Sequence, residues 1–278
     1  MPRSVGVVGG GTMGAGIAHV FLAAGARVAL VEADDARGIA ALDRIDRSLR
    51  RASDRGHLGD VADALERLRV GADLALLADC ELAIECVPED PELKAAVLAD
   101  AERSLAPDAL LASNTSALSI DVLARRLQRP KRFVGMHFFN PVPASQLVEI
   151  VRGTATDDAA VADARAWAEL IGKQCIEVRD SPGFASTRLG MAMGLEAIRM
   201  VEEGAASPED IDTAMVLGYK VPVGPLRLTD LIGLDVRLAV AEYLHSTLGD
   251  RFRPPQLLRD KVGRGELGRK SGQGFYSW

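Results

Sequence analysis

Cysteine is scarce in this sequence, and long hydrophobic runs are lacking. Only three of the 278 residues are cysteine, and their spacing does not match a disulfide framework. No apolar stretch approaches the roughly twenty residues that span a bilayer. The first apolar segment starts at Ser4, which leaves no room for a signal peptide. We therefore expect a cytoplasmic protein with no membrane partner.

An excess of positive charge is also absent. Lysine and arginine together number 33, against 39 aspartate and glutamate residues, which gives a formal net charge of −6. Nucleic-acid-binding proteins usually carry a basic excess, so no nucleic-acid partner is expected. A hydrophobic fraction of 48% over this length is enough for one large domain or two smaller ones.

Short apolar runs alternate with helical patterns through the first two thirds of the chain. These runs cover residues 4–8, 27–31, 81–87, 109–112, 133–136, 147–151 and 174–178. Such alternation is typical of a mostly parallel sheet with helices on both faces. The sequence thus predicts an α/β Rossmann-type domain over residues 1–181.

A helical pattern replaces the alternation in the last third. From Leu189 onward, apolar side chains recur every fourth residue until Gly204, where a helix is expected to stop. Ser207 is followed by proline and two acidic residues, which is the pattern of a new helix start. We therefore predict a smaller all-α domain over residues 182–278.

A glycine fingerprint follows the first apolar run. Gly9 permits a tight turn, Gly11 lets the backbone approach a pyrophosphate, and Gly14 allows close packing of helix on strand. Thr12 and Met13 open the helix whose free N–H groups would bind the anion. The alternative is a glycine-rich turn in another kind of α/β protein.

The second apolar run ends in Glu32, 18 positions after Gly14. A carboxylate there would accept hydrogen bonds from the adenosine ribose and repel a 2′-phosphate. Glu32 therefore favours NAD over NADP, a preference that the nearby Arg37 moderates. NAD is the expected cofactor, and no metal is expected.

An insertion over residues 35 to about 70 is predicted to form two helices. One face carries Leu42, Ile45 and Leu49, and the other carries Arg44, Arg47, Arg51 and Arg55. Two interpretations remain open. The arginines form a solvated face neutralised by neighbouring aspartates, or Arg51 and Arg55 bind phosphates of a coenzyme A tail or of a carrier protein's phosphopantetheine.

Polar residues between the two predicted domains carry the chemistry. Ser116 and His137 lie near the ends of predicted strands, where ligands of open α/β sheets bind. Histidine suits the base that accepts a hydroxyl proton, and Glu149 could orient it and stabilise its imidazolium. Alternatively, His137 is a hydrogen-bonded core residue and Glu149 an ordinary strand-end charge.

Six motifs in order extend these observations over essentially the whole chain. They are GGGTMGAGIA, SNTSALSI, HFFNPVP followed by LVE, DSPGF, VGPLRLTDLIGLD and GRKSGQGFY. Through these motifs the sequence resembles the L-3-hydroxyacyl-CoA dehydrogenase family. The resemblance implies a Rossmann domain, a helical domain that builds a homodimer, and an acyl thioester substrate.

The resemblance also implies roles for particular residues. His137 is the implied general base and Glu149 its orienting carboxylate, while the Ser116 hydroxyl lies near the substrate oxygen and the nicotinamide. The cofactor site is implied to include Glu89, Lys94 and Asn114, and the substrate site Asn140. Lys94 is implied to reach the nicotinamide-side ribose, and its alternative is a solvated helix lysine.

Thr187 departs from the family pattern, which usually has asparagine before Arg188. That asparagine assists the reacting oxygen of the substrate. Threonine can still donate a hydrogen bond, but it is shorter and has no amide. We expect Thr187 to act in catalysis with a changed rate or substrate choice, unless threonine simply replaces asparagine.

These residues predict an NAD-dependent dehydrogenase that interconverts a short-chain L-3-hydroxyacyl-CoA and its 3-oxoacyl-CoA. One alternative is the same chemistry on an acyl-carrier-protein substrate, as in polyketide extender-unit biosynthesis. Another is a protein that binds NAD without turnover.

Overall fold

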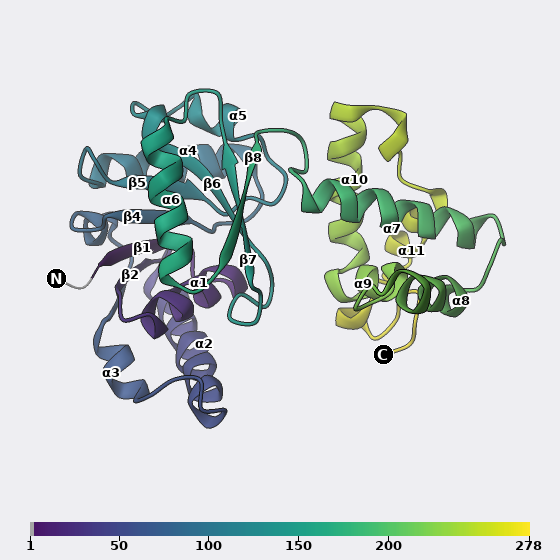
Figure 1. Ribbon diagram of the computed structural model, residues 1–278, viewed down its shortest axis with the longest axis horizontal. Coiled ribbons are helices and arrows are strands. Elements are labelled where there is room, and N and C mark those ends of the chain that lie inside the picture. Colours follow the sequence, from purple (N-terminus) through teal and green to yellow (C-terminus); the bar gives the residue numbers. More distant parts are fainter. Residues whose placement is uncertain (1–2) are drawn as a thin grey trace. The chain divides into compact units, whose positions relative to one another are not determined.

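The computed structural model describes residues 3–278, which form two compact units, Met1–Asp180 and Ser181–Trp278. The first unit contains a sheet of eight strands with helices on both faces (Figure 1). The second unit contains α7 (Ser186–Glu202) and the helices that follow it, and it includes no strand of that sheet. The predicted fold class is therefore confirmed.

The sheet has the strand order β3-β2-β1-β4-β5-β6-β7-β8. Its strands are β1 (Ser4–Val8), β2 (Arg27–Val31), β3 (Leu68–Gly71), β4 (Leu82–Glu85), β5 (Leu110–Ser113), β6 (Phe133–Phe138), β7 (Leu147–Arg152) and β8 (Gln174–Arg179). All neighbouring strands are parallel except β6 and β7, which run antiparallel. The candidate site described below includes residues of this antiparallel pair.

Two sets of helices cover the sheet. On one face lie α1 (Thr12–Ala23), α2 (Asp35–Asp54) and α6 (Asp158–Leu170), and on the other lie α4 (Pro91–Ser104) and α5 (Ile120–Ala124) (Figure 1). Phe21 of α1 packs edge to face against Trp167 of α6, with ring centroids 5.8 Å apart. Apolar side chains of these two helices join those of β1 and β2 in one core cluster.

The predicted insertion after β2 is partly correct. It forms α2 and then α3 (Val61–Glu66), but residues 68–71 form the edge strand β3, which the sequence did not predict. Four residues with a central arginine provide neither a long apolar run nor clear alternation. Leu42 was also misplaced, since its side chain is 41% exposed while Ile45 and Leu49 are fully buried.

The second unit is built on α7. Its buried face carries Met191, Leu195 and Ile198, which pack into a core of their own. Leu189, which the periodicity placed on the buried face, is 70% exposed. The side chain of Ser207 caps α8 (Pro208–Thr213) by accepting a hydrogen bond from the backbone of the third helical residue, as predicted.

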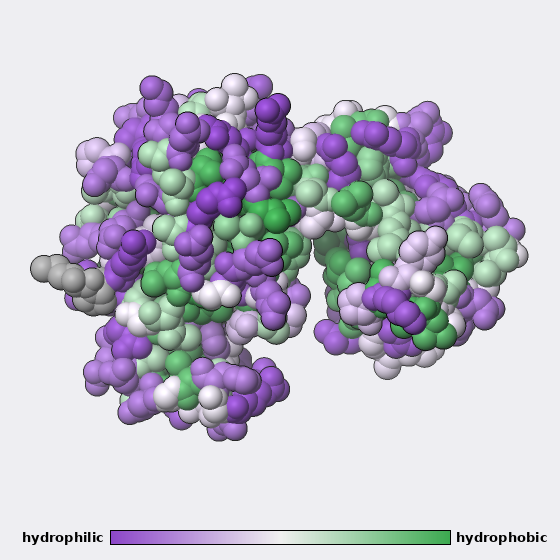
Figure 2. All heavy atoms as spheres, in the orientation of Figure 1, coloured by the Kyte–Doolittle hydropathy of each residue, from purple (hydrophilic) through white to green (hydrophobic). Residues whose placement is uncertain are grey.

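The remaining elements of this unit are η3 (Ala214–Gly218), α9 (Pro225–Ile232), α10 (Leu234–Leu248), η4 (Asp250–Phe252), α11 (Gln256–Gly263) and η5 (Arg269–Ser271); those of the first are η1 (Leu74–Leu77) and η2 (Pro130–Arg132). Polar side chains cover much of the face of each unit seen in Figure 2. Within residues 3–278, no helix has both the length and the apolar character that crossing a membrane requires.

Candidate functional site

The glycine loop joins the end of β1 to the start of α1. Gly9 has a φ of 97°, which favours glycine, and its N–H donates to the carbonyl of Val31 at 2.8 Å. A Cβ on Gly14 would lie 1.8 Å from the Gly9 carbonyl oxygen, so helix and strand pack too closely for any side chain there. A Cβ on Gly11 would meet nothing within 4 Å. The fold itself therefore does not require glycine at position 11.

The carboxylate of Glu32 is fixed beside this loop at the end of β2. Its Oε1 accepts a hydrogen bond from the Gly10 N–H at 2.6 Å, and its Oε2 accepts one from Ala33 at 3.1 Å. Sequence reasoning missed Gly10, where a Cβ would lie 2.3 Å from that of Ala41. Only glycine allows α2 to pack this closely on the loop.

These features fit a dinucleotide. The open space at Gly11 is a cradle that a side chain would fill. Thr12 and Met13 begin a helix with no side-chain cap, so its first N–H groups can bind an anion. Arg37 lies beside Asp34 at 3.5 Å, so a carboxylate already compensates the charge that could attract a 2′-phosphate. Glu32 therefore dominates at the ribose end of this site.

A buried ionic cluster lies at the ends of β4 and β5. Lys94, which is 1% exposed, places its Nζ 2.8 Å from Glu85 Oε1 and 3.2 Å from Glu89 Oε2. Burial opposes the charged form of Lys94, but the two carboxylates outweigh that effect and raise its pKa. The solvated alternative for Lys94 is therefore wrong.

Glu85 holds the other end of this cluster, and sequence reasoning missed it. The side chain is fully buried, accepts a hydrogen bond from Ser113 Oγ at 2.6 Å, and accepts another from the Val87 N–H at 2.7 Å. A glutamate that ends an apolar strand resembles Glu32 in the sequence. That position after a buried run was the one signal that could have found it.

Glu89 connects the cluster to the predicted catalytic serine. Its Oε1 accepts hydrogen bonds from Thr115 Oγ1 at 2.6 Å and from the Ser116 N–H at 3.0 Å. The Asn114 side-chain oxygen accepts a hydrogen bond from the backbone of Phe138 at 2.9 Å. Three sequence-predicted residues, Glu89, Asn114 and Ser116, are thus brought together with the end of β6.

His137 and Glu149 face each other across the antiparallel pair of β6 and β7. The register pairs the two residues directly, and His137 Nδ1 lies 2.7 Å from Glu149 Oε2. Glu149 is fully buried and His137 is 7% exposed. The Phe139 ring packs on the imidazole with centroids 4.5 Å apart. Strand pairing therefore fixes the orientation that a histidine base requires.

Other predicted residues lie outside this cluster. Asn140 is exposed just after β6, and Arg51 and Arg55 are exposed near the end of α2, where neither forms an ion pair within residues 3–278. Arg47 of the same helix does pair with an aspartate, as the solvated-face interpretation expects. Thr187 lies in the first turn of α7 in the second unit.

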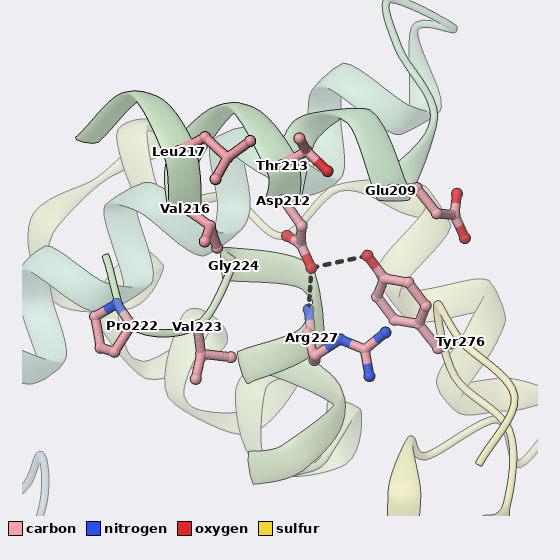
Figure 3. Close-up of a pocket in the computed structure, with 10 residues that line it drawn as sticks. All are labelled: Glu209, Asp212, Thr213, Val216, Leu217, Pro222, Val223, Gly224, Arg227 and Tyr276. Atoms are coloured by element: carbon pink, nitrogen blue, oxygen red, sulfur yellow. Dashed lines mark hydrogen bonds between the residues drawn. The ribbon is translucent and has the colours of Figure 1, made fainter. Parts of the chain in front are cut away.

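The second unit also contains a pocket of about 390 Å³ that includes none of the predicted site residues (Figure 3). Asp212 is central, because its carboxylate accepts hydrogen bonds from the backbone of Leu226 and Arg227 and from the Tyr276 hydroxyl, each at 2.8 Å. Desolvation and the Asp212 carboxylate raise the pKa of Tyr276. These bonds fix the start of α9, so Asp212 and the Tyr276 hydroxyl have a structural role.

The sheet, the glycine loop with its ribose-side carboxylate, and a buried His–Glu pair together define a nicotinamide-dependent oxidoreductase. Residues 4–181 match the model of the 3-hydroxyacyl-CoA dehydrogenase NAD binding domain, and residues 183–278 match that of the C-terminal domain. The chain belongs to the 3-hydroxyacyl-CoA dehydrogenase family. The predicted family, enzyme class and cofactor, NAD, are confirmed.

Similar proteins agree over the full length. A probable 3-hydroxybutyryl-CoA dehydrogenase of Deinococcus radiodurans is 43% identical over 98% of this chain and 99% of its own. The crystal structure of Mycobacterium tuberculosis FadB2 superposes with a TM-score of 0.96 at 43% identity, covering 100% of this chain and 99% of that one. The (S)-3-hydroxybutyryl-CoA dehydrogenase PaaH1 of Ralstonia eutropha gives 0.95 at 41%, with coverage of 100% and 99%.

Proposed function

We propose that this enzyme oxidises a short-chain L-3-hydroxyacyl-CoA to the 3-oxoacyl-CoA, and catalyses the reverse reduction, with His137 as the general base. The observation that carries the proposal is the 2.7 Å contact between His137 Nδ1 and Glu149 Oε2 inside a buried strand pair. The names of similar proteins, which specify 3-hydroxybutyryl-CoA, support a short acyl group.

His137 takes up the proton of the substrate hydroxyl as the carbonyl forms, and in the reverse direction it returns that proton. Because Glu149 engages Nδ1, the other ring nitrogen, Nε2, exchanges the proton. Glu149 holds this tautomer and stabilises the imidazolium. NAD, when bound, would supply the acceptor for the hydride of the hydroxyl carbon.

Ser116 adds a hydroxyl beside this reaction, and Glu89 holds its backbone in place. We infer that Thr187 donates a hydrogen bond to the reacting oxygen from α7, in place of the family's asparagine. The residues proposed to line the cofactor site are Gly9, Gly11, Thr12, Met13, Gly14, Glu32, Glu89, Lys94 and Asn114. Ion pairs with the carboxylates of Glu85 and Glu89 hold the Lys94 side chain in place for this role.

The acyl chain could be carried either by coenzyme A or by a carrier protein. Exposed guanidinium groups at Arg51 and Arg55 suit the phosphates of coenzyme A or the phosphopantetheine of a carrier protein. We propose coenzyme A as the carrier and Asn140 as a substrate contact. The carrier-protein substrate remains the second candidate, because Thr187 departs from the family pattern.

We further propose a homodimer assembled through the second unit. Leu189, Leu217 and Tyr219 are exposed there by 70%, 64% and 79%, and a partner subunit would cover such side chains. A cytoplasmic location is also proposed, because Cys80, Cys86 and Cys175 are all free thiols.

The test is NADH oxidation by the purified enzyme with acetoacetyl-CoA, run beside the same acyl group on a carrier protein. His137→Ala is expected to abolish turnover, while the control His57→Ala, on an exposed residue beyond α2, keeps it. Turnover of the carrier-protein substrate alone would show that the enzyme acts on an acyl group bound to a carrier protein and not to coenzyme A. NADH binding without turnover on either substrate would overturn the proposed function in favour of a binding protein.

A further inference from the structure

Arg237 of α10 is a buried guanidinium without a carboxylate partner. The residue is 7% exposed, and within residues 3–278 no salt bridge or carboxylate hydrogen bond reaches it. Among the residues that the structure describes, Nη1 donates to the Met191 sulfur at 3.3 Å, and the buried Nε has no partner. Desolvation lowers its pKa to about 10. A buried cation with so few acceptors is costly unless an anion joins it.

The guanidinium lies against two glycines of α7. A Cβ on Gly194 would lie 3.8 Å from Arg237 Cζ, and a Cβ on Gly190 would lie 3.9 Å from Nη1. Both glycines are inside a helix, where glycine costs about 1 kcal/mol relative to alanine, so the helix itself does not favour them. The guanidinium therefore packs directly against α7, and a Cβ at either position would be in van der Waals contact with it.

Thr187 lies on the same face of α7. Positions 187, 190, 191 and 194 follow the i, i+3, i+4, i+7 spacing that aligns side chains along one stripe of a helix. The step from Thr187 to Met191 is one helical turn, about 5 Å along the axis. A group bound by Arg237 would therefore lie within a few bonds of a group bound by Thr187.

We propose that Arg237 binds a carboxylate carried by the acyl group of the substrate, so that the enzyme acts on 3-hydroxyacyl thioesters with a second, distal carboxylate. This rests on the proposed function, because it places the reacting oxygen at Thr187. A planar guanidinium matches a carboxylate through two parallel hydrogen bonds. The bound carboxylate supplies the missing countercharge.

The first experiment compares 3-oxoadipyl-CoA with 3-oxohexanoyl-CoA, two substrates of equal length that differ in the terminal carboxylate. The wild-type enzyme is expected to show the higher kcat/KM with the carboxylate substrate. Arg237→Leu is expected to reduce the ratio of the two kcat/KM values by at least about tenfold. Its kcat/KM for the uncharged substrate should change little, because that substrate has no group for Arg237.

Two further variants control for charge and folding. Arg237→Lys keeps the charge but loses the fork, so an intermediate ratio is expected. Arg259→Leu removes a guanidinium of α11 that pairs with Glu242, and the wild-type ratio should remain. Arg237→Leu is expected to melt no lower than wild type, because it removes an uncompensated buried charge. An equal preference in the wild-type enzyme, or a ratio retained in Arg237→Leu, would overturn the proposal.

A binding measurement separates this inference from the proposed function. Adipate is expected to raise the Tm of the wild-type protein and to leave that of Arg237→Leu unchanged. If neither acyl-CoA turned over, the proposed function would fail, but the adipate shift would still support a carboxylate site. An adipate shift that is absent from the wild type, or equal in both proteins, would refute that site.

Discussion

Replacing Glu149 with glutamine tests the catalytic pair directly. Glutamine keeps the size of the side chain but removes the negative charge from a group that is fully buried and lies 2.7 Å from His137 Nδ1. When His137 accepts the substrate proton, the wild-type enzyme has an imidazolium beside a carboxylate. The variant has an imidazolium beside a neutral amide.

The magnitude follows from Coulomb's law. Two unit charges whose centres are about 4 Å apart attract by about 4 kcal/mol at an effective dielectric constant of about 20. Since about 1.4 kcal/mol corresponds to a tenfold change in rate, Glu149→Gln is expected to lower kcat for 3-hydroxyacyl-CoA oxidation by roughly a thousandfold. KM should change little, because the lost interaction develops only with the proton transfer.

The assay is the initial rate of NADH formation, with NADH affinity measured separately by fluorescence titration. Glu177→Gln is a matched control on the adjacent strand β8, where the glutamate pairs with Arg152 and Arg165 near the surface. That control should keep nearly full kcat. A loss below about tenfold in Glu149→Gln, with folding and NADH affinity intact, would refute the role assigned to Glu149.

Three other predictions concern the fold and the cofactor. Glu85→Gln leaves the buried Lys94 ammonium short of a countercharge and should lower the free energy of unfolding by about 3–5 kcal/mol in urea titrations, whereas Glu85→Leu combined with Lys94→Met should cost less. Gly11→Ala should leave the Tm unchanged and weaken NADH binding. Gly14→Ala, whose Cβ would lie 1.8 Å from a carbonyl oxygen, should lower the Tm as well as the affinity for NADH. A hydrogen bond from an adjacent arginine, and then one from a lysine, lower the pKa of Glu266 from 4.5 to about 2. Its stabilisation is therefore present above pH 4.5 and lost as the pH falls toward 2, so Glu266→Gln should lower the Tm at pH 7 but not at pH 2.

Local sequence signals were sufficient for most of the sheet and for the cofactor loop. Most strands that the sequence predicted are runs of largely buried residues, although β8 is mostly exposed, and the glycine spacing depends only on the turn from β1 into α1. The pairing of His137 with Glu149 could also be expected, because strands that follow one another in the sequence are usually neighbours in a sheet. Strand β3 and the buried face of α7 could not be predicted from local sequence, because their structure depends on packing against neighbouring elements.

The spacing of residues in the sequence does not predict which charged side chains are buried. Nothing in its local sequence distinguishes Arg237 from other helix residues, and the only signal for Glu85 is its position at the end of an apolar run. Their importance comes from the loss of solvent, which only the fold determines. Glu85 meets Lys94 at 2.8 Å, so the protein compensates that charge itself. Arg237 has no such carboxylate within residues 3–278, and the same physical cost is the reason we propose an anion from outside the chain for it.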